Sequence, residues 1–541
     1  MGQTVVEDEA IRALFAEDGG QGGVVLVVGP PRSGKTALAL AAAKEAMASF
    51  GPQRAVLAVS NRRIADEYST ELIRHVGVST QMRPATTLNA LAFRLVAAQR
   101  EHDGLPLPRL LNGAEQDVLL RRVLAVHLDH ARAGDVCGTC RLLRDYFQHE
   151  RWMSFVTDQS GEDDDAAAST TAALLEEGVS AAFVAQLRDM LARMDEVGAG
   201  RSTEGEVLAA VGDCGMTGER LRIQWRLAYA LRAEYIAMMR ETYPDEYRLD
   251  ASYLQVAGIV AARRAEPSGL PRIVIVDDVQ DLTLAGFGFL EALQARGVRL
   301  LLIGNPDESV QSFRGSYPEY LFRQIDERFH PAQVTLDYAG GDEYLRVVQA
   351  RVSLSIATSE EGLRPVPQRP GKMPALPGAY PISRVDVAQG DDSVRAALYR
   401  TPTEEIDDVV WRIKTEHLLN GMAWNSMAVV LHDNDAIRTY GERLRREGVP
   451  VRFSSVTRPL AEEPFVEGLF SLIELAQLRN DGLAGRALPL AKLAAFVRSR
   501  VRAIVASPLL DIASKQDGDA ADVAAATRPM DMHALDTAMR A

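Results

Sequence analysis

The sequence has 541 residues, which is long enough for three or four domains with separate cores. Its 47% hydrophobic and 25% charged residues are typical of a soluble globular protein. Asp and Glu outnumber Lys and Arg by 74 to 60, and the net charge of −14 argues against a protein that coats nucleic acid non-specifically. A local basic groove on this acidic body remains compatible with the charge.

The apolar runs are too short to span a bilayer, and the N-terminus lacks the basic-then-apolar pattern of a signal peptide. We therefore expect a cytoplasmic protein without a membrane partner. The first expected element is a short helix over residues 7–17, followed by a glycine-rich turn.

Residues 24–28 are five apolar, mostly β-branched residues, which predict a buried strand. An Ala- and Leu-rich helix is expected through residue 50. Between them stands the phosphate-loop pattern Gly-x-x-x-x-Gly-Lys-Thr, made of Gly29, Pro30, Pro31, Arg32, Ser33, Gly34, Lys35 and Thr36.

A loop in this context can bind the phosphates of ATP. Its glycines let backbone N–H groups surround phosphate oxygens, and the following helix adds its partial positive charge. Lys35 would bind the outer phosphates and the Thr36 hydroxyl would hold Mg²⁺. The alternative is a glycine turn that carries Lys-Thr by chance.

Strands and helices then alternate, with a strand at 55–59, a helix at 64–76 and a further helix at 88–99 after the segment 82–87. This order predicts a doubly wound sheet. Residues 113–265 have helical periodicity and almost no strand signal, except for an acidic segment at 158–170 that we expect to be a disordered surface loop.

Strand patterns return at 273–276 and 298–303, with a helix at 284–295 between them. Six prolines between 365 and 381 indicate a linker. A second α/β pattern has strands at 394–399 and 427–431 and helices at 403–419 and 435–448, and residues 459–541 are mainly helical. The expected domains are 1–108 with 266–345, 109–265, 346–458 and 459–541.

Cys137 and Cys140 form a C-x-x-C pair, which is compatible with a redox pair or with half of a metal site. No second such pair exists, and Cys214 is the only other cysteine. We expect these cysteines to be plain reduced thiols.

The predicted strand 273–276 ends in the acids Asp277 and Asp278. A strand-end carboxylate such as Asp277 can bind Mg²⁺ opposite a phosphate loop, and the next one can orient the attacking water. A solvated acidic turn is the alternative.

Several short segments occur in a recognisable order: SNR at 60–62, TLNALA at 87–92, DDVQD at 277–281, GNPDESVQSFRG at 304–315 and LDY at 336–338. Together with the phosphate loop they resemble the motifs of UvrD/Rep/PcrA-like superfamily 1 DNA helicases. PLAEEP at 459–464 and ASPL at 506–509 further resemble the A subunit of actinobacterial AdnAB-type helicase-nucleases.

The resemblance implies two RecA-like motor domains, the second only partial here, with ATP between them and single-stranded DNA across their tops. It places Glu308 and Arg314 at the nucleotide and makes Phe313 a base-stacking platform. The alternative for Phe313 is a core position, and the alternative for Arg314 is a surface ion pair. For Arg62, Arg63 and Arg94 it is a solvated surface position. The residues expected to contact DNA are Ser60, Asn61, Arg62, Arg63, Thr87, Asn89, Arg94 and Phe313.

The sequence departs from these helicases at positions that take part in ATP hydrolysis. Asp278 stands where they have Glu, Glu308 where they have the Gln that senses the γ-phosphate, and Ala339 where they have an Arg that clamps it. Their adenine-reading Gln has no clear counterpart, and Glu9 is nearest. The chain also stops before their last motifs.

Two functions follow as hypotheses. The first is an ATP-dependent DNA helicase or translocase, 3′-to-5′ by resemblance, that acts in DNA repair or recombination. The second is a degenerate motor that binds nucleotide and DNA as a scaffold beside an active helicase-nuclease subunit. A P-loop kinase or transport ATPase lacks support, because Gln280 and Asp281 point to helicases.

Overall fold

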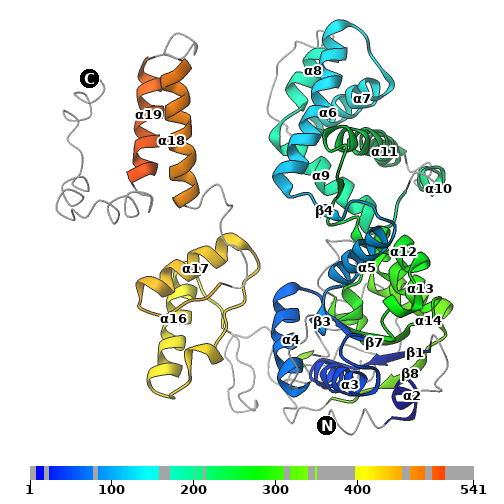
Figure 1. Ribbon diagram of the computed structural model, residues 1–541. Coiled ribbons are helices and arrows are strands. Elements are labelled where there is room, and N and C mark those ends of the chain that lie inside the picture. Colours follow the sequence, from blue (N-terminus) through cyan, green and yellow to red (C-terminus); the bar gives the residue numbers. More distant parts are fainter. Residues whose placement is uncertain are drawn as a thin grey trace, which may run out of the picture. The chain divides into compact units, whose positions relative to one another are not determined.

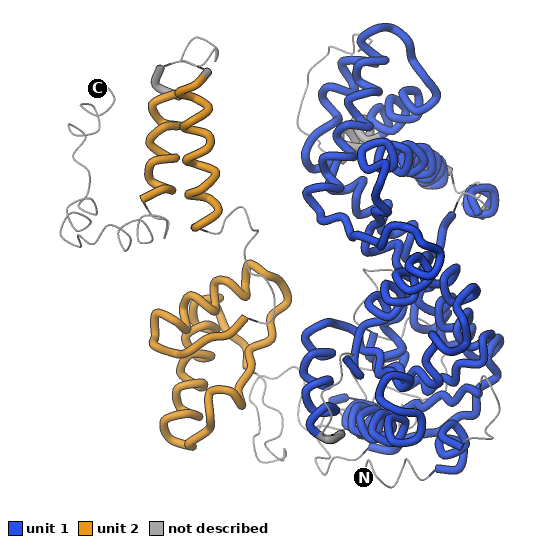
Figure 2. The backbone as a smooth tube through the Cα atoms, in the orientation of Figure 1, with its two compact units in different colours: residues 1–395 blue, residues 396–541 orange. Residues whose placement is uncertain are grey.

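The computed structural model divides into two units, residues 1–395 and 396–541, which are described separately (Figure 2). The residues that the structure describes are 8–16, 23–76, 83–157, 171–200, 203–210, 215–309, 317–338, 348–349, 397–453, 464–481 and 490–505. The predicted loop at 158–170 and the proline-rich linker at 365–381 lie outside them.

The first unit contains a six-stranded sheet in the order β3-β2-β6-β7-β1-β8, in which every neighbouring pair is parallel (Figure 1). The predicted α/β class and the four predicted strands of this sheet are confirmed. The sequence analysis missed the short strands β3 and β8. The strands are β1 (Val24–Val28), β2 (Ala55–Ala58), β3 (Ala85–Thr86), β6 (Ile273–Asp277), β7 (Arg299–Gly304) and β8 (Ala332–Thr335).

The central strands are buried on both faces, which explains their unbroken apolar sequences. In β1 the side chains of Val24, Leu26 and Val28 enter one core, whereas those of Val25 and Val27 enter another. This split follows from the two-residue repeat of a strand, which sends successive side chains to opposite faces.

Helices cover both faces of the sheet. The first core holds the apolar stripe of α5, whose buried residues recur at the helical spacing of three and four. The second core holds the small residues of α3. The helices are α2 (Glu9–Ala13), α3 (Lys35–Phe50), α4 (Arg62–Val76), α5 (Leu88–His102), α12 (Leu254–Arg264), α13 (Leu284–Gln294) and α14 (Pro318–Phe329).

A helical segment lies between α5 and α12 in the chain and has a hydrophobic core of its own, as the sequence predicted for most of residues 113–265. It is joined to the sheet layer by a two-stranded parallel ribbon that was not predicted, formed by β4 (Pro108–Leu110) and β5 (Tyr247–Leu249). The helices are α6 (Gly113–Ala133), α7 (Gly138–Thr157), α8 (Thr171–Gly178), α9 (Ala181–Glu196), α10 (Glu204–Ala210) and α11 (Gly215–Thr242).

The described part of the second unit contains helices but no strand. The predicted strand at 427–431 is wrong, and residues 397–399 of the predicted strand 394–399 are not in a strand either. A strand needs a hydrogen-bonded neighbour, and Val430 is instead 91% exposed. The helices are α16 (Pro402–Leu418), α17 (Asn434–Arg446), α18 (Pro464–Asp481) and α19 (Leu490–Val505).

None of the helices among the described residues has the length and apolar character needed to cross a membrane.

Gly258 allows α12 to pack closely on α5 and α13. A Cβ at this position would lie 2.8 Å from the Cβ of Ala92 and 3.0 Å from the Phe289 ring. We predict that Gly258→Ala lowers the free energy of unfolding by about 1–3 kcal/mol, because overpacking outweighs the gain in helix propensity. Chemical denaturation measures the change.

Gly269→Ala is the matched control, since nothing lies within 4 Å of a Cβ built there. It should change the free energy of unfolding by less than about 0.5 kcal/mol. A Gly258→Ala protein as stable as the wild type would contradict the close packing of α12.

Candidate nucleotide-binding site

The carboxyl edge of the sheet collects most of the residues predicted to be functional. Because the strands are parallel, the loops after β1, β2, β3, β6 and β7 all leave from this edge. In open α/β sheets ligands bind at this edge, outside the carboxyl ends of the strands. The structure thus brings the phosphate-loop pattern and the strand-end acids into one region.

The loop after β1 has a compact backbone that depends on its glycines. Gly34 has a φ of 90°, in the left-handed region that favours glycine. A Cβ on Gly29 would lie 2.5 Å from the Ser33 hydroxyl and 2.8 Å from the Cβ of Leu336. Arg32 also has a positive φ, of 60°, which is strained for a residue with a side chain. The turn is closed by the Ser33 amide, which donates to the Pro30 carbonyl at 3.2 Å.

Donor groups at the end of this loop suit an anion. The N-cap of α3 is Gly34, which has no side chain to accept hydrogen bonds from the first amides of the helix. The Ser33 hydroxyl is buried and has no hydrogen-bond partner among the described residues. Free amides and a buried hydroxyl at a helix N-terminus form a site suited to phosphate oxygens, so the loop fits the phosphates of a nucleotide.

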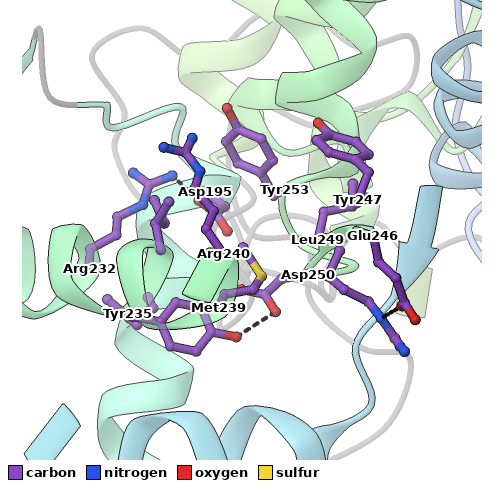
Figure 3. Close-up of a pocket in the computed structure, with 13 residues that line it drawn as sticks. Asp195, Arg232, Tyr235, Met239, Arg240, Glu246, Tyr247, Leu249, Asp250 and Tyr253 are labelled. Carbon is purple, nitrogen blue, oxygen red and sulfur yellow. Dashed lines mark hydrogen bonds and ion pairs between the residues drawn. The ribbon is translucent and has the colours of Figure 1, made fainter. Parts of the chain in front are cut away.

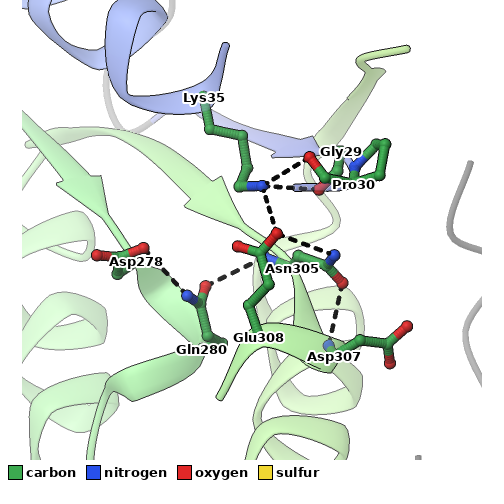
Figure 4. A network of polar contacts seen from close by, with 8 residues as sticks. All are labelled: Gly29, Pro30, Lys35, Asp278, Gln280, Asn305, Asp307 and Glu308. Carbon is green, nitrogen blue, oxygen red and sulfur yellow. Dashed lines mark hydrogen bonds and ion pairs between the residues drawn. The ribbon is translucent and has the colours of Figure 1, made fainter. Parts of the chain in front are cut away.

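Lys35 lies at the centre of a polar network (Figure 4). Its ammonium donates to the carbonyls of Gly29 at 2.9 Å and Pro30 at 3.0 Å, and to the Glu308 carboxylate at 2.8 Å. The Lys35 side chain is only 9% exposed and that of Glu308 is 23% exposed. Glu308 therefore holds the cation that a phosphate group would need.

Asp277 and Thr36 lie together, as a shared Mg²⁺ site requires. Burial and the neighbouring charge of Asp278 raise the pKa of Asp277 to about 6, while a hydrogen bond with the Thr36 side chain acts in the opposite direction. A carboxylate and a hydroxyl supply the oxygen ligands that Mg²⁺ prefers. The donor set at this point therefore fits the cation.

A second part of the network connects the ends of β6 and β7. Gln280 is 2% exposed, donates to Asp278 at 3.1 Å and accepts from the Asn305 amide at 3.1 Å. Gly304 gives it room, since a Cβ there would lie 2.3 Å from the Gln280 side-chain oxygen. Asp278 has a φ of 61°, so its position is held by the surrounding structure. Gln280 and Asn305 both lie in segments that resemble helicase motifs, but neither was predicted from the sequence to have a role in the site.

The strand order sets the width of the site. β7 lies between β1 and β6, so the strand ends that carry the phosphate loop and Asp277 are two strand spacings apart, or about 10 Å, and the Thr36 and Asp277 side chains meet across this interval. The segment after β7 carries Glu308 into this interval. A bound triphosphate would therefore meet Glu308 between Lys35 and the acids.

Three of the predicted DNA contacts also have structural roles. Asn61 accepts the Ile64 amide at 3.0 Å at the start of α4, and Thr87 caps α5 by accepting the Ala90 amide at 3.2 Å. Asn89 donates to the Ala251 carbonyl at 3.4 Å. These bonds explain the residue types without DNA.

The other candidates for DNA contact differ in their exposure and in their ion pairs. Ser60, Arg62 and Arg63 are exposed, and Arg63 lies 3.7 Å from Glu67. Arg94 on α5 has two buried guanidinium nitrogens without a partner among the described residues. Burial lowers its pKa. An unpaired cation of this kind is the better candidate for a phosphate contact.

Phe313, Arg314 and Ala339 lie outside the described residues, so the base-stacking platform and the γ-phosphate clamp are predictions from the sequence alone. No protein-family model matches the chain, and no curated protein matches it.

A separate pocket of about 170 Å³ lies where α9 and α11 meet the segment from β5 to α12 (Figure 3). Several of its polar groups have partners in or beside the pocket. Arg232 and Asp195 form an ion pair, Ser252 donates to Asp195 at 2.9 Å, and Tyr235 donates to Asp250 at 2.9 Å. This pairing indicates a structural junction, and the sequence gave no signal for it.

Burial raises the pKa of Asp195 to about 6, and the Arg232 charge offsets only part of that effect. Between about pH 4 and 6 the folded protein then holds a proton that the unfolded chain releases, so this group's contribution to stability falls as the pH rises through that window. We predict that this group lowers the free energy of unfolding by up to about 3 kcal/mol over this range, and that Asp195→Asn removes that part of the decline.

Urea unfolding followed by Trp225 fluorescence, with the other three tryptophans replaced by Phe, measures this dependence. Trp225 packs against the core of the helical segment. Asp117→Asn removes another ion pair of the same segment and should retain the decline, because Asp195 is still present. An unchanged pH slope in Asp195→Asn would contradict the assignment.

We also predict that Glu308→Gln tightens nucleotide binding about tenfold, which corresponds to about 1.4 kcal/mol. The substitution frees the Lys35 ammonium and removes a carboxylate from the path of the phosphates. Titration with a fluorescent ATP analogue measures the affinity. Glu71→Gln is the control, since Glu71 forms an ion pair of 2.9 Å with Lys44 on the same helix as Lys35. Weaker binding in Glu308→Gln would contradict competition at Lys35.

Proposed function

We propose that this chain binds ATP and Mg²⁺ at the carboxyl edge of its sheet and acts as an ATP-dependent DNA helicase or translocase of the UvrD-like type. The observation that carries the proposal is the convergence of the phosphate loop with acids distant in the chain, in which Lys35 meets a side chain 273 residues further on. Residues 1–108 and 266–345 would then form a RecA-like motor domain, with 109–265 as its inserted helical subdomain.

Each side chain of this site would have a separate role in ATP hydrolysis. The nucleotide supplies the phosphate bond that is hydrolysed. Lys35 exchanges the Glu308 carboxylate for phosphate oxygens, and Thr36 and Asp277 hold Mg²⁺. Asp278, held by Gln280, accepts a hydrogen bond from the attacking water. Asp278 is one methylene shorter than the Glu of the resembled helicases, and a displacement of about 1 Å costs on the order of a hundredfold in rate.

DNA would pass along the same edge of the sheet. The exposed residues Ser60 and Arg62 follow β2. Arg94, which has two guanidinium nitrogens without a partner among the described residues, lies on the helix that follows β3. Loops at one edge can couple nucleotide binding to the grip on DNA when a second domain closes over them. The 3′-to-5′ polarity, the role in DNA repair and the cytoplasmic location derive from the resemblance.

A second function is favoured by the ion pair between Lys35 and Glu308. A carboxylate in contact with the phosphate-binding lysine opposes both binding and charge stabilisation of the transferring phosphoryl group. The chain would then be a degenerate motor that binds nucleotide and DNA weakly, as a scaffold for a partner helicase-nuclease subunit.

Single-turnover ATP hydrolysis with single-stranded DNA separates the two functions. For the motor we predict hydrolysis that DNA stimulates and that Lys35→Ala reduces by at least about a hundredfold, because the cation that stabilises the transferring charge is lost. For the scaffold we expect nucleotide binding without hydrolysis.

Lys44→Ala is the matched control, because Lys44 lies on the same helix and pairs with an exposed glutamate. It should keep the wild-type rate. If the Lys35→Ala protein still hydrolyses ATP at the wild-type rate, hydrolysis comes from another site and the proposed site is wrong. A wild-type chain that binds no nucleotide would also contradict the proposed site.

A further inference from the structure

Two histidines and two cysteines meet at the turn between α6 and α7. His127 and His130 lie in the last turns of α6, and Cys137 and Cys140 flank the start of α7. One ligand atom from each of the four lies within 4.8 Å of the corresponding atoms of the others. The cluster is in the helical segment, away from the loops at the edge of the sheet.

We propose that His127, His130, Cys137 and Cys140 form a structural Zn²⁺ site that fastens α6 to α7. Zinc prefers four tetrahedral ligands from Cys and His, and a site with four protein ligands leaves no position open for catalysis. The proposal does not depend on nucleotide or DNA binding.

The distances fit a tetrahedron. Metal–ligand bonds of about 2.0–2.3 Å give tetrahedral edges of about 3.3–3.8 Å. The Cys137 and Cys140 sulfurs are 3.4 Å apart, and Nδ1 of His127 lies 3.4 Å from the first and 3.5 Å from the second. Three of the four ligand atoms therefore already have the mutual spacing that a zinc ion imposes.

The fourth ligand, His130, supports the proposal through its buried ring nitrogen. Nδ1 of His130 is buried and has no hydrogen-bond partner in the part of the chain that the structure describes. A buried nitrogen without a partner is costly, and a metal bond would satisfy it. The two histidine rings lie edge to face with their centroids 5.9 Å apart, which keeps both next to the cysteines.

A further set of contacts holds the ligands in place. Nε2 of His127, the nitrogen opposite the cysteines, contacts the Glu234 carboxylate, and Thr139 donates to the other Glu234 oxygen at 2.7 Å. A carboxylate behind a ligating histidine fixes its tautomer and orientation. The Cys140 amide donates to the Cys137 sulfur at 3.4 Å. Since Glu234 belongs to α11, the site would tie three helices together.

The types of ligand atom indicate which metal ion the site would bind. A tetrahedral site of two imidazoles and two thiolates is typical of zinc, whereas Mg²⁺ and Ca²⁺ require oxygen ligands. This proposal replaces the sequence-based expectation that Cys137 and Cys140 are plain thiols. That expectation looked for a second cysteine pair, but the partner ligands are the histidines of H-x-x-H on the preceding helix.

Metal analysis of the full chain tests the site. Protein purified without chelators or metal-affinity resin should contain about one zinc per chain. The double variant Cys137→Ser/Cys140→Ser should lose it. His102→Gln, a control histidine exposed at the end of α5, should retain it.

Cobalt substitution keeps the test valid if the double variant fails to fold. Wild-type protein stripped of metal and titrated with Co²⁺ should show the intense visible absorption of tetrahedral cobalt and a thiolate-to-cobalt charge-transfer band, both saturating at one equivalent. Glu234→Gln should keep this spectrum but weaken metal binding by about 10–100-fold, since Glu234 only positions His127.

Three results would overturn the proposal. They are a wild-type chain that neither contains zinc nor gives the tetrahedral cobalt spectrum, a double serine variant that keeps its zinc, and an isolated protein in which Cys137 and Cys140 form a disulfide without metal.

Discussion

The parallel pairing of β1, β7 and β6 is the constraint on which the site depends. These strands are apolar except for Arg299 at the start of β7 and Asp277 at the end of β6, and helices cover both faces, so polar groups gather where the strands end. Parallel pairing places all carboxyl ends at one edge. Segments that are hundreds of residues apart therefore meet there, and the close fit of Gly29 and Gly304 to their neighbours holds the loops in register.

At that edge the same lysine serves two purposes. Bound to Glu308 and two carbonyls, Lys35 stabilises the structure without nucleotide, and with phosphate it would carry the chemistry. In the proposed functions, the balance between these partners would help to separate an active motor from a scaffold. The Ser33 hydroxyl, which has no hydrogen-bond partner within the described ranges, favours a bound anion, whereas Glu308 opposes it. The Glu308 carboxylate is thus one of the features on which the two proposed functions differ.

In the helical segment, clusters of polar side chains connect neighbouring helices. Near the sheet, Asp195 and Arg232 form a paired junction beside a pocket. At α6 and α7, the histidines and cysteines lie at metal-binding distances, with Glu234 behind His127. In both places a polar contact with α11, through Arg232 or Glu234, joins helices that are distant in sequence.

The sequence by itself determined the alternation of strands and helices in the first unit and the candidate residues from Gly29 to Thr36, because a buried strand and a glycine-rich turn are local patterns. It failed for the predicted strand at 427–431, since a strand forms only with a partner. Only the tertiary structure decided that Glu308 binds Lys35 and that His127 and His130 lie beside the cysteines. The contact between Lys35 and Glu308 depends on how segments 273 residues apart pack, and no local pattern encodes it. The histidines and cysteines are close in the sequence, but the turn between α6 and α7 decides that their ligand atoms meet.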